Sequence, residues 1–175
     1  MSSFLKAKYG SATFPLSTDD LTLLVESEAE ELDVYADLSC YGPGVEGITV
    51  FVPGAKPRVK ISRELAETSS LANRFRTTLS HEFGHVHFHG YLFDESLRSL
   101  DLFGPASGIR VTPATEQIQI CKRDTMVDAA QTDWMEWQAG HVCGANLMPA
   151  SVIRQFLRTR HEGDMATSSM KVSSV

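Results

Sequence analysis

The chain has 175 residues, of which 42% are hydrophobic and 22% are charged, and its formal net charge is −6. This length and composition are those of a single soluble globular domain. The acidic balance lacks the basic footprint of a nucleic-acid-binding protein, so we expect no direct contact with nucleic acid.

The sequence also bears on the compartment. No apolar run approaches the length that crosses a bilayer, and the first residues lack the apolar stretch of a signal peptide. The three cysteines, Cys40, Cys121 and Cys143, are odd in number and widely spaced, which suits a reducing compartment better than a disulfide framework. These features predict a cytoplasmic protein without a membrane segment.

The N-terminal half predicts one helix followed by a hairpin. Apolar residues recur at helical spacing over residues 18–36, and a polar side chain at 17–19 could cap the start of this helix. Glycines and a proline mark a turn at 40–47. Two β-rich runs follow at 48–52 and 58–61, and the short loop between them predicts that they pair as a hairpin.

The C-terminal half predicts three helices and one short strand. A helix is expected from about 67 to 89, where no proline interrupts the apolar period. Residues 94–127 are broken by glycine and proline, so we expect them to be irregular apart from a short strand at 117–121. Two further helices are predicted at 132–147 and 151–160.

Domain organisation follows from the composition along the chain. No internal repeat or long linker divides it, so residues 1–161 are expected to form one domain. From Glu162 onward the chain is small and polar, and residues 162–175 are predicted to be a disordered tail.

The segment His81-Glu82-Phe83-Gly84-His85 carries the strongest chemical signal. Side chains four residues apart lie on one face of a helix, so the imidazoles of His81 and His85 can reach one ion. Zinc binds imidazole nitrogen, and a divalent metal activates a water so that a carboxylate can take its proton at neutral pH. Glu82, beside the first ligand, is the candidate general base.

The five-residue pattern alone also occurs by chance, and the alternative is an exposed helix that happens to carry two histidines. The context favours a metal site, because four of the six histidines fall between His81 and His89. The apolar residues among them indicate that this helix is half buried: Phe83, Val86 and Phe88.

A catalytic zinc site needs a third protein ligand and an open position. One class takes that ligand from H-E-x-x-H-x-x-G-x-x-H, but Phe88 and Tyr91 replace this glycine and histidine, which excludes the class. The candidate is Glu136, which lies among two tryptophans and a methionine, where a carboxylate is unfavourable to bury unless it is paired or binds metal. Asp128 and Asp133 are weaker candidates, and Glu136 could also be a surface acid on an amphipathic helix.

Two segments together form a longer pattern. The first runs from His81 to His89 as H-E-F-G-H-V-H-F-H, and the second runs from Glu136 to Pro149, beginning E-W-Q-A and ending A-N-L-M-P. The combination resembles the ImmA/IrrE family of metallopeptidases, which pairs H-E-x-G-H-x-x-x-H with a later helix E-x-x-A-N-x-x-A-x-x-L-x-M-P. Glu136 stands thirteen residues before Pro149, as that pattern requires. The chain departs from it at Gly140, usually asparagine, and at Val142, where an aromatic residue is common.

The resemblance implies a fold, a site and a partner. The implied fold is an α+β, zincin-like one, in which a small antiparallel or mixed sheet packs on an active-site helix and a ligand-bearing helix. The implied site has His81, His85 and Glu136 as ligands of Zn²⁺, or of another divalent metal such as Mn²⁺, with Glu82 as the base. The implied setting is a bacterial or phage cytoplasm, and the implied substrate is a helix-turn-helix transcriptional regulator.

The remaining histidines have weaker assignments. His89 repeats the four-residue step one turn beyond His85, so it is expected to support the site rather than complete the ligand set. His87 points elsewhere and is expected at the surface. His141 or Tyr91 could donate a hydrogen bond to a developing oxyanion, although a structural hydrogen bond is the more common explanation.

Cys121 is followed by Lys122 and Arg123, which could lower the pKa of its thiol. A thiolate that reached the open metal position would switch the enzyme off. The alternative is an ordinary buried or exposed thiol without a role in regulation.

Three functions are open: an endopeptidase, a metal-binding regulator that holds a partner without cutting it, and a structural zinc domain. Glu82 argues against the third, because a closed coordination sphere needs no base. An enzyme is favoured because nearly every part needed for hydrolysis is present. We expect an extended substrate to add to the sheet edge near Val50, and residues 94–127 to form a wall or lid over the cleft.

Overall fold

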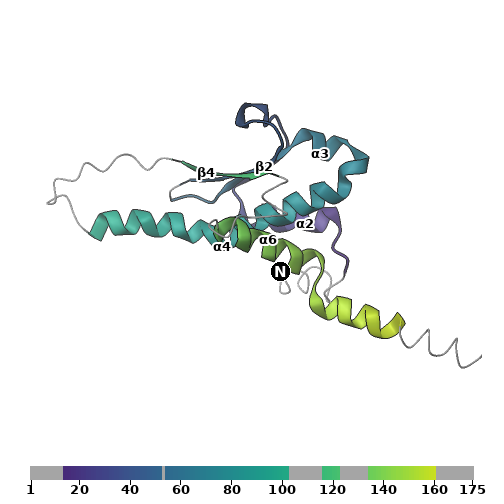
Figure 1. Ribbon diagram of the computed structural model, residues 1–175. Helices are drawn as coiled ribbons and strands as arrows, with labels where there is room; N and C mark the ends of the chain where they lie inside the picture. The colour runs from purple at the N-terminus through teal and green to yellow at the C-terminus, as the bar shows by residue number, and fades with distance from the viewer. Residues whose placement is uncertain (1–13, 53, 103–115, 123–133, 161–175) are drawn as a thin grey trace, which may run out of the picture.

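The computed structural model describes residues 14–52, 54–102, 116–122 and 134–160, with no side chains described over 92–102. A four-stranded mixed sheet packs against helices that cover one of its faces (Figure 1), which confirms the predicted α+β class. The strands are β1 (Glu31–Ala36), β2 (Val45–Phe51), β3 (Arg58–Ser62) and β4 (Gln117–Lys122). The helices are α2 (Thr18–Glu28), α3 (Arg63–Glu67), α4 (Ala72–Leu102), α6 (Trp134–Leu147) and a further helix over 150–160. In these described ranges, no helix is both long enough and apolar enough to cross a membrane.

Helix α2 is shorter than predicted. It starts at a capping box, in which Ser17 Oγ accepts a hydrogen bond from the backbone N–H of Asp20 and the Asp20 carboxylate accepts one from the backbone N–H of Ser17. The helix ends at Glu28, and Glu31–Ala36 forms strand β1 instead of continuing the helix, so the prediction of one helix over 18–36 was wrong. The residues of β1 alternate between apolar and polar up to Tyr35, as in a strand, although the segment also fits a helical period. Its parallel pairing with β3, which is distant in sequence, makes it a strand.

The sheet has the strand order β1-β3-β2-β4. Strands β2 and β3 run antiparallel with Thr49 opposite Val59, which confirms the predicted hairpin, although β2 begins at Val45 rather than at 48. Strand β4 pairs antiparallel with the other side of β2, so that Val50 lies opposite Ile118. The expectation of a free sheet edge near Val50 was therefore wrong, because β2 has a neighbour on both sides.

Helix α4 carries the H-E-x-x-H segment and differs from the prediction at both ends. The extended backbone at Thr68 and a single 3-10 turn, η2 (Ser69–Leu71), separate it from α3, so it begins at Ala72 rather than near 67. It continues to Leu102, so residues 94–102 are helical rather than irregular. The first proline beyond the motif is at 105, so no proline interrupts the helix over this range.

The other predicted elements agree with the structure where it describes them. The strand expected at 117–121 is β4, the helix expected at 132–147 is described from Trp134 as α6, and a helix is present over 150–160. The predicted lid falls largely on residues 103–115 and 123–127, outside the described residues. The predicted tail, Asp128 and Asp133 lie outside them too.

The main hydrophobic core lies between α2, α4 and one face of the sheet. Its members come from all three layers and include Val25, Leu21, Val59, Ile61, Leu79 and Phe83. Fully burying one such side chain stabilises the fold by roughly 1.5–3 kcal/mol. Because Leu79 and Phe83 belong to this core, the intervening turn of α4, which carries His81 and Glu82, is held firmly against the sheet.

Candidate metal centre

The site forms where α6 crosses α4. Gly84 lies at the crossing, and a Cβ atom added to it would be 2.9 Å from the Cα of Ala139, closer than real contacts allow. The two helices can therefore approach this closely only because residue 84 has no side chain. This contact explains the glycine in the first motif and the alanine in the second, and it brings Glu136 over the histidines of α4.

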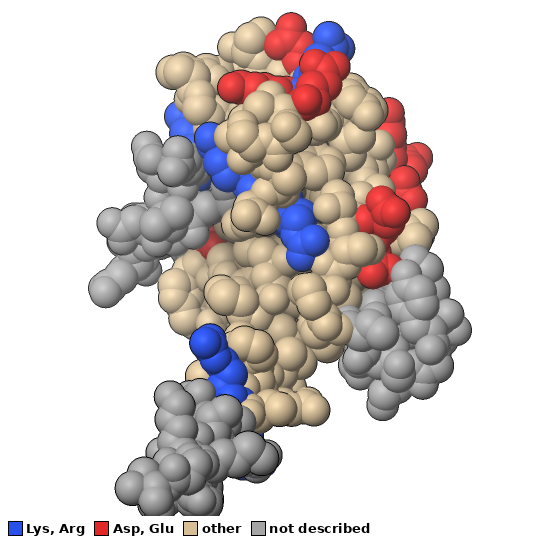
Figure 2. All heavy atoms as spheres, turned by 90° about the vertical axis from the view of Figure 1, so that its right-hand side faces the viewer, with Lys and Arg blue, Asp and Glu red and all other residues tan. Residues whose placement is uncertain are grey.

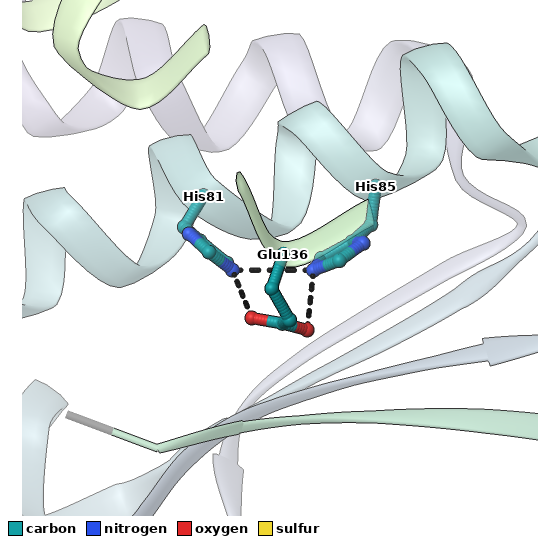
Figure 3. Close-up of side chains that lie close together, drawn as sticks. All are labelled: His81, His85 and Glu136. Atoms are coloured by element: carbon teal, nitrogen blue, oxygen red, sulfur yellow. Dashed lines mark hydrogen bonds and ion pairs between the residues drawn. The ribbon is translucent and has the colours of Figure 1, made fainter. Parts of the chain in front are cut away.

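Three donor groups converge at this crossing (Figure 3). Nε2 of His81 lies 3.1 Å from Nε2 of His85 and 3.1 Å from Oε2 of Glu136. Nε2 of His85 lies 3.2 Å from Oε1 of Glu136. A tetrahedral ion with bonds of 2.0–2.1 Å to nitrogen has ligand atoms about 3.3 Å apart. The spacing therefore fits one small divalent ion, and the three residues are those predicted from the sequence.

The chemistry of the donor set also fits a cation. All three side chains are buried, and a group of this kind could hold a metal ion. Burial opposes ionisation of Glu136, but its hydrogen bonds to His81 and His85 outweigh this effect and lower its pKa to about 2. Glu136 is thus an anionic oxygen donor at neutral pH, beside two imidazole donors, a combination typical of zinc.

Glu82 contacts the sheet and is not part of this donor set. Its Oε2 accepts a hydrogen bond of 2.5 Å from the hydroxyl of Thr49, in the central strand β2. A Cβ atom at Gly47 would lie only 2.4 Å from the other oxygen, Oε1, so a larger residue there would displace the carboxylate. Burial raises the pKa of Glu82, while His85, His81 and the Thr49 hydrogen bond oppose that rise. A carboxylate with a raised pKa, next to the ligands but not among them, has the properties of a general base.

Thr49 and Gly47 were not identified from the sequence. The signal for them was weak but present, because a glycine inside a strand often marks the close approach of another group. The strand places both residues on the face that looks toward α4, since side chains two apart in a strand point the same way.

A second buried polar group lies beside the base and was also missed. Glu46 is 4% exposed, forms an ion pair with Arg74 and accepts a hydrogen bond of 3.4 Å from Thr78. It lies where the pairing of β2 with β4 shifts register. These contacts attach β2 to α4 one to two turns before His81, and so help to fix the distance between Thr49 and Glu82.

No protein-family model matches the chain, and no curated protein matches it either. Membership of the ImmA/IrrE family therefore stays a prediction based on the two motifs. The meeting of both motifs at one buried point is an observation independent of that resemblance.

The other histidines behave in three different ways. His89 is buried and contacts His85, as expected for a supporting residue, with its pKa lowered by burial. His87 is exposed and pairs with Glu28 at 2.7 Å, which confirms its surface position. His141 is exposed and stacks on Trp137. Tyr91 is 57% exposed. The metal-ligand side chains are buried, whereas those of His141 and Tyr91 are exposed. An oxyanion role for either residue therefore stays a prediction.

Cys121 has the properties of an ordinary buried thiol, one of the two alternatives, and not those of a thiolate. It lies opposite Gly47 in the β2–β4 pairing and is buried. Burial raises the pKa of its thiol well above the usual value, and the charges of Glu82 and Glu136 raise it further. The expectation that Lys122 would lower this pKa was wrong, because successive side chains of a strand point to opposite faces and Lys122 is exposed. Arg123 lies outside the described residues.

Proposed function

We propose that the chain is a zinc-type metallo-endopeptidase with a zincin-like fold, using Zn²⁺ or a similar divalent metal. The observation that carries the proposal is the convergence of three donor groups, whose nearest atoms lie 3.1–3.2 Å apart, beside a separate, buried carboxylate. The resemblance of both motifs to the ImmA/IrrE family supports the same conclusion.

Each residue then has a defined task in peptide hydrolysis. His81, His85 and Glu136 hold the ion, which when bound supplies a Lewis acid and activates water at neutral pH. Glu82 accepts the proton of the attacking water and transfers it to the leaving amine. Thr49 holds the carboxylate of Glu82 in one orientation through its hydrogen bond. Together these groups form a minimal hydrolytic site.

The ligand set favours an enzyme over a structural zinc domain. Structural zinc is bound by four protein ligands, whereas a catalytic site keeps one position open. Within the described ranges, three residues meet in the group and no fourth histidine, cysteine, aspartate or glutamate joins it. The buried thiol of Cys121 is not part of this group.

We propose that an extended substrate segment adds to strand β4. This strand pairs with β2 on one side, and none of the other described strands pairs with its second side. It runs past the site, since Cys121 is close enough to Glu82 and Glu136 for their charges to raise its pKa. Adding a strand to this edge would hold a peptide bond near the metal ligands, with affinity coming from main-chain hydrogen bonds.

The proposed partner is a helix-turn-helix transcriptional regulator, in a cytoplasmic setting. The resemblance implies it, and the net charge of −6 is consistent with attraction to a basic, DNA-binding protein. Figure 2 shows acidic side chains at the top, where a basic side chain lies beside them, and along the right-hand edge of the face drawn there. The acidic right-hand edge could orient a basic partner during encounter.

The test uses the purified chain loaded with Zn²⁺ and the helix-turn-helix regulator encoded beside its gene. We expect about one ion per chain by elemental analysis and discrete fragments of the regulator by mass spectrometry. The control is Glu82→Gln, which should keep the fold and the metal but lose cleavage. Metal binding without any cleavage by the wild-type chain would instead favour the non-catalytic regulator, and cleavage at the wild-type rate by Glu82→Gln would overturn the mechanism.

A further inference from the structure

A line of hydrogen bonds leads away from one of the two candidate histidine ligands. Nδ1 of His85 lies 3.0 Å from Nδ1 of His89. Nε2 of His89 lies 3.1 Å from Oε1 of Gln138, on α6. His89 is completely buried, and its ring packs edge-on against Trp134 at 5.7 Å between centroids. The line therefore starts at the metal-facing ring and ends on the helix that supplies Glu136.

The direction of these hydrogen bonds follows from the chemistry of imidazole. A neutral ring has one N–H donor and one acceptor nitrogen. For Nε2 of His85 to bind a metal, the proton of that ring must lie on Nδ1. This N–H donates to Nδ1 of His89, so the proton of His89 lies on its Nε2. That N–H in turn needs an acceptor, which Oε1 of Gln138 supplies.

The opposite placement of these protons would prevent His85 from binding metal. If residue 138 offered a donor instead of an acceptor, Nε2 of His89 would have to accept and its Nδ1 would carry the proton. The His85 ring would then carry its proton on Nε2, where the metal has to bind. His81 has no comparable support, since its Nδ1 has no hydrogen-bond partner among the described residues.

We propose that Gln138, acting through His89, is a positioning residue that holds His85 in the tautomer able to bind metal. The proposal rests on the metal centre proposed above and assigns a role to a side chain that touches neither the ion nor the substrate. Metal-binding histidines commonly donate their second N–H to a partner that fixes their orientation, and losing the partner weakens metal affinity by roughly 10–100-fold. Here the partner is a second histidine, whose own proton is placed by an amide from another helix.

The experiment measures Zn²⁺ affinity of the full chain by competition with a chromophoric chelator. Gln138→Met keeps an unbranched side chain of similar length but removes the acceptor, and it should weaken binding by roughly 10-fold or more. Gln138→Glu keeps an acceptor oxygen at the same position and should bind within about threefold of the wild type. His89→Phe keeps a ring but leaves the His85 N–H without an acceptor, so it should bind as weakly as Gln138→Met. Gln155→Met makes the same substitution on the exposed helix over 150–160 and should change nothing.

A second measurement reads proton positions rather than affinity. Nitrogen-15 chemical shifts of the imidazoles, recorded with saturating Zn²⁺, report which nitrogen of His89 carries its proton. We expect Nε2–H on His89 in the wild type and in Gln138→Glu, and a mixture of His89 tautomers in Gln138→Met. This mixture would distinguish loss of proton placement from a general loss of packing.

The outcomes separate this proposal from the proposed metal centre. Wild-type affinity in Gln138→Met, or affinity in Gln138→Glu as weak as in Gln138→Met, would overturn the positioning role of Gln138 while leaving the metal centre intact. If the wild-type chain fails to bind Zn²⁺ at all, the metal centre is wrong. If the zinc-loaded wild type carries the His89 proton on Nδ1, the positioning role of Gln138 is overturned while the metal centre stands.

Discussion

Helices α2 and α6 each bury one face, but the faces they bury are opposite in character. Helix α2 buries leucine and valine, with Leu24 and Val25 in the main core. Helix α6 buries Glu136, Ala139, Cys143 and Asn146. Its tryptophans, Trp134 and Trp137, are 49% and 57% exposed.

This difference separates a part of the molecule that stabilises the fold from a part that carries chemistry. Burial of a polar group is unfavourable unless it is hydrogen-bonded or bound to an ion. The polar inner face of α6 therefore contributes less to stability than the apolar face of α2 and provides the ligand Glu136 instead. Local departures from the usual hydrophobic pattern are expected at functional sites, and α6 is such a departure.

The contrast between α2 and α6 is tested most directly by truncating one buried side chain in each helix. Glu136→Ala should abolish stoichiometric zinc binding, because it removes one of three ligands. Leu24→Ala should leave zinc affinity of the folded chain unchanged but lower the free energy of unfolding by about 2–5 kcal/mol. Denaturant titrations with a chelator present, together with elemental analysis, measure both effects.

For the metal-free chain, Glu136→Ala should lower the unfolding free energy less than Leu24→Ala does. The hydrogen bonds lost with the carboxylate are offset by relief of its burial. The contrast between the two helices would be refuted by a Glu136→Ala chain that still binds zinc tightly, or by a larger loss of stability in Glu136→Ala.

The helix crossing gives a second test, with a control in the same helix pair. Gly84→Ala places a methyl group against the backbone of Ala139, so it should lower the unfolding free energy by about 1–3 kcal/mol and weaken zinc binding. Gly144→Ala is the control, because a Cβ atom there meets nothing within 4 Å. It should be neutral or stabilise by up to about 1 kcal/mol through helix propensity. Equal effects at both positions would show that the close approach at Gly84 is not needed.

The start of α2 should respond to a change that leaves the site untouched. Ser17→Ala removes the hydroxyl that accepts from the backbone N–H of Asp20 at 3.1 Å. We expect a loss of about 1 kcal/mol in unfolding free energy, with no change in zinc affinity. Thermal unfolding and chelator competition check this pair of results, and a drop in zinc affinity would mean that α2 is coupled to the site.

The smallest expected effect is a difference in thiol reactivity at pH 8. Burial raises the pKa of Cys143 to about 11 and that of Cys121 well above its usual value, so both thiols stay protonated and unreactive. Cys40 is exposed. A disulfide reagent should therefore modify one thiol quickly in the native chain and the other two only on unfolding. Equal reaction rates for all three would contradict the burial of Cys121 beside Glu82.

Much of the candidate site could be predicted from the sequence because its geometry is local. The positions of His81 and His85 on one helix face follow from 3.6 residues per turn. Glu136 could be selected because a polar residue among tryptophans stands out and because its distance from Pro149 fits a longer motif. These inferences needed only spacing along one segment at a time.

The structure alone decided how separate segments meet. The hydrogen bond from Thr49 to Glu82 joins residues 33 apart, and the contact of Gln138 with His89 joins residues 49 apart. Strand β1 was mistaken for helix because its partner β3 lies far along the chain, and β2 was mistaken for an edge because β4 lies beyond α4. Helical spacing is set by the backbone geometry of one segment. Strand neighbours and the partners of a buried carboxylate or imidazole are set by packing between segments, which spacing along the chain does not reveal.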